Sequence, residues 1–128
     1  MQDQPTPAEV IGAVAQFLKT VVTAETTGAT SFQARVAANA LEMMKRELEL
    51  APAADAAERE RLKALLGHDG DLVSLNTELS HRIAEGAMGL ETPGLADHLW
   101  ATTLAKLAVD QPTYAAYRAS LAERAPKA

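Results

Sequence analysis

The sequence contains no cysteine. This absence excludes disulfide bonds, thiolate metal sites and cysteine nucleophiles, and it suits a reducing compartment, so we expect a cytoplasmic protein. Aromatic residues make up only 4% of the chain, and no apolar run approaches the roughly eighteen residues of a membrane span. Residues 1–7 are polar and lack the basic and apolar regions of a signal peptide. We therefore expect neither export nor a membrane partner.

The chain also has no excess of positive charge. Its net charge is -5, and its twelve lysines and arginines are scattered rather than collected in one run. Binding to the phosphates of nucleic acid or to an anionic membrane requires a basic face. We therefore expect no nucleic-acid partner.

Alanine is the most abundant residue, with 27 copies in 128 residues. Alanine is the best helix former, whereas strands favour β-branched and aromatic residues. The length fits one domain. The composition predicts an all-α fold, a compact bundle of about six helices in a single domain over residues 1–128 with its core at about 5–121.

Caps and turn residues divide the chain into helices. Thr6, Pro7 and Glu9 form a capping-box pattern, Pro52 is expected to end the second helix, and Asp71 is expected to cap the fourth. Gly67 suits the residue after a helix end. The predicted helices span residues 6–23, 30–50, 55–66, 71–86, 95–109 and 113–121.

The predicted helix 30–50 has a wide apolar arc that contains one carboxylate, Glu47. A buried carboxylate requires a partner, an upward pKa shift or a path to the solvent edge. An ion pair with an arginine from a neighbouring helix is the structural interpretation, and an acid or base in a cleft is the functional one. A separate polar stripe with helical spacing contains Arg35, Asn39, Glu42 and Arg46. It is either a solvated face with ion pairs within the helix or a strip that binds carboxylate or phosphate.

Asn76 interrupts the apolar face of the helix 71–86. We expect it to be buried and to bond a loop carbonyl or a helix end, with ligand contact as the alternative. Arg82 lies at the margin of the same face, from which it could reach Glu47 or a partner's carboxylate. The candidate binding residues are therefore Arg35, Asn39 and Arg82, and the candidate buried polar residues are Glu47 and Asn76.

The motifs that accompany common chemistry are missing. The three histidines lie on different predicted segments without the spacing of a zinc or di-iron site, and no P-loop, GxGxxG or GxSxG motif is present. We therefore expect no metal and no cofactor, and we assign no catalytic residue.

Several short segments together resemble a small bacterial helical family of unknown function. They are residues 32–41 (FQARVAANAL), 46–48 (REL), 65–67 (LLG), Leu75-Asn76 with Leu79 and Ile83, and residues 106–114 (KLAVDQPTY). Some members of that family are fused to, or encoded beside, aminoglycoside-phosphotransferase-like kinases. The resemblance covers about residues 5–121, and it implies a kinase-like partner that acts on a small metabolite.

Three functions are compatible with these observations. The first is a non-catalytic accessory domain that binds a phosphotransferase-like kinase or a second copy of itself, and a flat exposed apolar patch would favour it. The second is a bundle that binds a small carboxylate or phosphate, and an open groove lined by Arg35 and Asn39 would favour it. The third is an enzyme that uses Glu47, and a pocket that reaches this residue would favour it.

Overall fold

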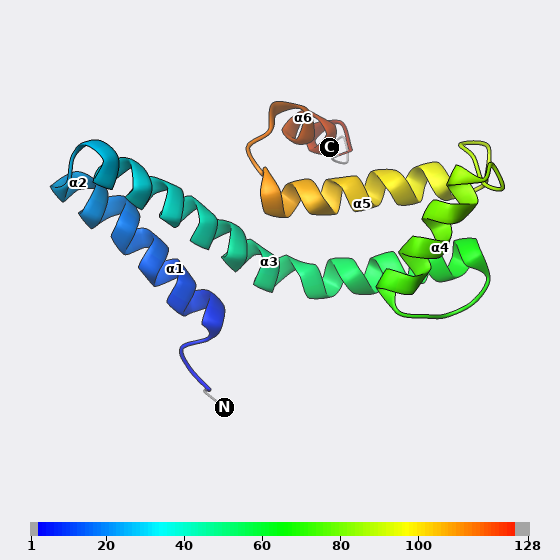
Figure 1. Ribbon diagram of the computed structural model, residues 1–128, viewed down its shortest axis with the longest axis horizontal. Helices are drawn as coiled ribbons and strands as arrows, with labels where there is room; N and C mark the ends of the chain where they lie inside the picture. Colours follow the sequence, from blue (N-terminus) through cyan, green and yellow to red (C-terminus); the bar gives the residue numbers. More distant parts are fainter. Residues whose placement is uncertain (1–2, 125–128) are drawn as a thin grey trace. The chain divides into compact units, whose positions relative to one another are not determined.

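The computed structural model describes residues 3–124 of the chain (Figure 1). This range is helical without any strand, so the predicted all-α class is confirmed. The chain forms two compact units, one up to Leu50 and one from Ala51 onward. The elements are α1 (Pro7–Phe17), a π-helical stretch η1 (Leu18–Val22), α2 (Thr23–Glu25), α3 (Gly28–Leu66), α4 (Leu72–Ala84), α5 (Leu95–Asp110) and α6 (Ala115–Arg124). None of the helices within residues 3–124 combines the length and the apolar character that a membrane crossing requires.

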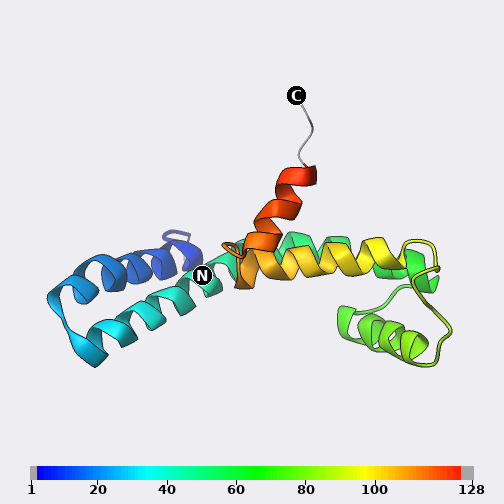
Figure 2. The same ribbon diagram turned by 90° about the horizontal axis from the view of Figure 1, so that it is seen from above.

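The N-terminal unit is a helical hairpin in which α1, η1 and α2 run antiparallel to the first half of α3 (Figures 1 and 2). The predicted capping box opens it, because the Thr6 side chain accepts a bond from the Glu9 amide and the Thr6 amide donates to Glu9 Oε2. At the turn, the Ser31 hydroxyl donates to the Thr23 carbonyl at 3.1 Å. Helix α2 ends at Glu25 and α3 begins at Gly28, so the connection is shorter than the segment 24–29 between the two predicted helices.

Small side chains form the contact between the two arms of the hairpin. Among residues 3–50, Ala15, Ala34 and Ala38 are the buried ones. The stem of Lys45 crosses Gly12 so closely that a Cβ at position 12 would lie 3.3 Å from its Cδ and Cε. We call these contacts the alanine seam. Small residues let two helix backbones approach closely, but each buries little apolar area.

Helix α3 continues through Pro52, where the sequence analysis predicted a break between two helices. A proline inside a helix removes one hydrogen bond and costs about 3 kcal/mol. Here the segment Ala51–Ala57 contains five alanines besides the proline, and alanine is the strongest helix former. The predicted helices 30–50 and 55–66 are therefore one element of 39 residues, and the prediction of a helix end at Pro52 is wrong.

The C-terminal unit has a leucine-rich core. Its buried members come from the end of α3, from α4, from the loop after α4 and from the start of α5: Leu62, Leu66, Leu75, Leu79, Met88 and Leu95. Asp71 caps α4 through the Ser74 amide at 3.0 Å, as predicted. Gly67 ends α3 with a φ of +82°, a conformation that glycine adopts without strain. Thus both ends of the α3–α4 loop follow their sequence signals.

Replacing Pro52 tests the continuity of α3. We expect Pro52→Ala to raise the free energy of unfolding by about 1–3 kcal/mol, because it restores a backbone donor within a helix. This net value includes a small opposing effect, since the unfolded chain has more conformational freedom without the proline. Urea denaturation measures the change. Pro93→Ala is the matched control, because Pro93 lies in the turn before α5 and its replacement restores no helical bond. A Pro52→Ala variant no more stable than the parent would contradict an unbroken α3.

Candidate functional site

The first half of α3 is apolar on the side that points away from α1. Phe32 and Val36 each stand two residues from an alanine of the seam, which places them nearly opposite it on a helix. We define the distal face of α3 as Phe32, Val36, Met43 and Leu50. Their side chains are 59%, 52%, 37% and 41% exposed. Large apolar residues at helical spacing are thus left open to solvent.

The partner arm of the hairpin also carries exposed apolar residues. They recur at i, i+4, i+7 and i+11 along α1 and η1 and are Val10, Val14, Phe17 and Val21. They are large, yet the residue of this arm that is fully buried is the small Ala15. The hairpin therefore encloses its small residues and exposes its large ones, the reverse of an ordinary soluble helical pair.

Two members of the predicted polar stripe, Arg35 and Asn39, are exposed on α3, and the other two, Glu42 and Arg46, are half-buried. The exposure of Arg35 and Asn39 is what an open binding strip requires, and their role in binding stays a prediction. Glu42 Oε1 forms an ion pair with Lys19 Nζ at 2.9 Å, so this member of the stripe joins the two arms of the hairpin. Its partner thus comes from the other arm rather than from the stripe itself.

Glu47 is exposed, so the prediction of a buried carboxylate is wrong. The helical wheel placed Glu47 correctly in an apolar arc beside Met43 and Val36. That arc is itself open to solvent, because the hairpin covers only one side of α3. A carboxylate in it therefore needs no buried partner. The i, i+4 ion pair of this region joins Lys45 to Glu49 at 2.6 Å instead.

Asn76 is partly buried rather than buried, and its side chain bonds two groups of the protein. Its Nδ2 donates to Glu58 Oε1 at 2.8 Å and to the Leu72 carbonyl at 3.0 Å. The first bond joins α4 to α3 and the second stays within α4. The asparagine thus fixes how these two helices pack, through a side-chain carboxylate rather than the predicted loop carbonyl or helix end.

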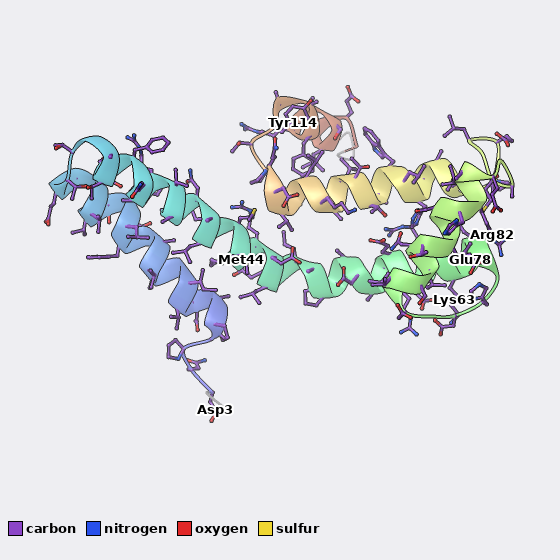
Figure 3. All side chains as sticks on the ribbon, in the orientation of Figure 1. Asp3, Met44, Lys63, Glu78, Arg82 and Tyr114 are labelled. Carbon is purple, nitrogen blue, oxygen red and sulfur yellow. The ribbon has the colours of Figure 1, made fainter. Side chains whose placement is uncertain are left out.

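Arg82 is held by its own helix. Its Nη2 donates to Glu78 Oε1 at 2.5 Å, and both residues are labelled in Figure 3. The other oxygen of Glu78 lies 2.8 Å from Nε2 of His68 in the α3–α4 loop. The Arg82 bond, followed by His68, holds the pKa of Glu78 below its usual value. The bond to the Asp69 carbonyl and then Glu78 raise the pKa of His68. The contacts from Arg82 through Glu78 to His68 hold the loop against α4. A binding role of Arg82 stays a prediction.

Two polar residues that the sequence analysis did not select lie at a pocket in the C-terminal unit. His98 is only 2% exposed, and Arg61 lines the same pocket on α3. A signal for His98 was present, because Leu95, His98, Thr102 and Val109 follow the i, i+3, i+7, i+14 spacing of a buried stripe. Leu99 and Trp100 of the same helix lie outside this stripe and are 40% and 44% exposed.

The comparisons with known proteins identify a family without an assigned activity. Residues 24–114 match the family described as a domain of unknown function, DUF6285. The match covers more than half of the chain, so this protein belongs to the DUF6285 family. No curated protein and no solved structure matches it significantly.

Asn76→Ala should lower the free energy of unfolding by about 1–2 kcal/mol, because it removes the α3–α4 hydrogen bond and leaves the Glu58 carboxylate without this donor. Urea denaturation measures the loss. Thr77→Ala is the control, because Thr77 is exposed and its hydroxyl bonds only the Val73 carbonyl of its own helix. Equal midpoints for the two variants would show that the Asn76–Glu58 bond does not hold the helices together.

The His68–Glu78 pair predicts a pH dependence. The pKa of His68 is raised in the folded protein, so its contribution to stability is fully present below the unfolded value of 6.5 and is lost as pH rises through the folded pKa. We expect His68→Gln to destabilise more at about pH 6 than at about pH 9. Thermal unfolding at both pH values measures this. His81→Gln, an exposed histidine on α4, should lack the difference, and a pH-independent effect of His68→Gln would refute the pairing.

Proposed function

We propose that this chain is a non-catalytic accessory domain that binds another protein through the distal face of α3. The observation that carries the proposal is the row of large apolar side chains on that face, which are between 37% and 59% exposed. Exposed apolar patches on soluble proteins usually mark interaction sites. An exposed apolar patch is the feature that favours an accessory domain over a ligand-binding bundle or an enzyme.

The polar residues around the distal face give it a charge pattern. Glu47 lies within the apolar arc, and Arg35 and Asn39 flank it on one side. A partner that covers this face would bury Glu47, and a buried carboxylate needs a cation. The complementary surface is therefore an apolar helix that carries a lysine or arginine opposite Glu47.

The proposed partner is a phosphotransferase-like kinase. The support is the resemblance of the chain to a family whose members are fused to or encoded beside such kinases. The DUF6285 match supports the family part of that resemblance. A helix of the kinase would lie along α3, as amphipathic helices commonly do in helix-mediated recognition.

The test is co-expression of the chain with a phosphotransferase-like kinase of the kind that the resemblance implies, followed by co-purification. We expect a complex in size-exclusion chromatography with light scattering, and we expect Val36→Asp to abolish it, because a carboxylate would be buried at the centre of the contact. Val73→Asp is the matched control, because Val73 is a 77% exposed helical valine of the C-terminal unit.

The same measurement separates the alternatives. A homodimer that Val36→Asp dissociates, with no kinase bound, would assign the distal face to self-association and overturn the kinase as partner. A monomer that binds no kinase, or a complex that Val36→Asp and Val73→Asp weaken equally, would overturn the distal face as the binding surface.

A further inference from the structure

A pocket of about 240 Å³ lies in the C-terminal unit between the end of α3 and the first turn of α5. Its apolar lining comes from Ala64, Leu65 and Pro93, and its polar lining from Arg61, Asp97 and His98. The volume is below the range of about 300–1,000 Å³ that holds drug-sized ligands. The pocket therefore suits a metabolite of a few carbon atoms.

Two buried polar atoms of the pocket residues lack hydrogen-bond partners within the described chain. They are Nδ1 of His98 and Nε of Arg61. A buried polar atom without a partner is energetically unfavourable, and such atoms are rare in native proteins. An oxygen supplied by a ligand would remove both penalties.

The electrostatic surroundings of His98 favour a neutral ring. Burial and then the Arg61 guanidinium lower the pKa of His98, and Glu58 opposes them. At neutral pH the imidazole therefore carries one proton, and the tautomer with that proton on Nδ1 can donate it to a ligand. Nη2 of Arg61 donates to Thr102 Oγ1 over a long 3.3 Å. Both unpartnered atoms are closed off from solvent, so a ligand that bonds them has to displace the guanidinium from this tether.

The start of α5 adds a third attractive element. Gly94 is its N-cap and lines the pocket, and no side chain caps the helix. The first amides of a 16-residue helix carry a partial positive charge that favours anions. The guanidinium, the imidazole and the helix N-terminus together form a recognition set for a carboxylate.

We propose that this pocket binds a small carboxylic acid, whose carboxylate accepts hydrogen bonds from Nε of Arg61 and Nδ1 of His98. Asp97 lines the same pocket and is exposed. Its carboxylate repels a second anionic group and accepts from a donor. The ligand is therefore a monocarboxylate that carries a hydroxyl or ammonium group beside a short apolar body.

The test is a titration of the full chain with propanoate, lactate and inorganic phosphate, followed through the His98 imidazole resonances by NMR. Propanoate and lactate should shift these resonances and raise the pKa of His98, because a carboxylate favours the imidazolium. Lactate should bind about fivefold tighter than propanoate, because its hydroxyl donates to Asp97. Asp97→Asn should reduce this preference.

Two variants address the site itself. Arg61→Gln should weaken lactate binding by on the order of tenfold, because it removes a charge-assisted bond. Ala64→Phe should block binding by filling the pocket from an exposed position of α3, with Arg61 and His98 unchanged. Arg59→Gln is the control, because Arg59 pairs with Asp69 at 2.9 Å and does not line this pocket.

Three outcomes would overturn the proposal. One is a His98 spectrum that neither propanoate nor lactate changes. The second is lactate binding that Ala64→Phe leaves at the parent level. The third is a response to phosphate stronger than the response to either carboxylate, which would assign the pocket to a different oxyanion.

Discussion

A pair of helices can bury only one side of each, and the N-terminal unit of this protein uses that side for its smallest residues. Ala15, Ala34 and Ala38 close the seam, and Gly12 lets the stem of Lys45 cross it. The large residues Phe32 and Val36 consequently remain on the distal face. The surface that we propose for protein binding thus follows from how the hairpin is closed.

The C-terminal unit is organised in the usual way, with large side chains inside. Leu62 and Leu75 are almost completely buried, and the hydrogen bond from Asn76 to Glu58 joins the helices that carry them. His98 continues the buried stripe of α5 that Leu95 begins. A buried imidazole in such a stripe requires a hydrogen-bond partner, and Nδ1 of His98 has none within the described residues. This unpaired atom is the physical basis of the proposed carboxylate pocket.

Local signals were read correctly where one or two neighbouring residues decide the backbone. The Thr6 capping box, the Asp71 cap and the Gly67 helix end depend on bonds within a few residues. The prediction of a helix end at Pro52 was wrong, although a proline is also a local signal. A helix break is a balance of free energies, and the alanines on both sides of the proline shift that balance toward a continuous helix.

By itself, the sequence determined the all-helical class, the caps and the apolar character of the arc around Glu47, because these depend on composition and helical spacing. Only the tertiary structure decided which side of α3 is covered, and therefore that Glu47 is exposed. It also brought Arg61 of α3 and His98 of α5 to one pocket. The physical reason is that a wheel describes the faces of one helix, whereas burial depends on which neighbours the chain places against each face.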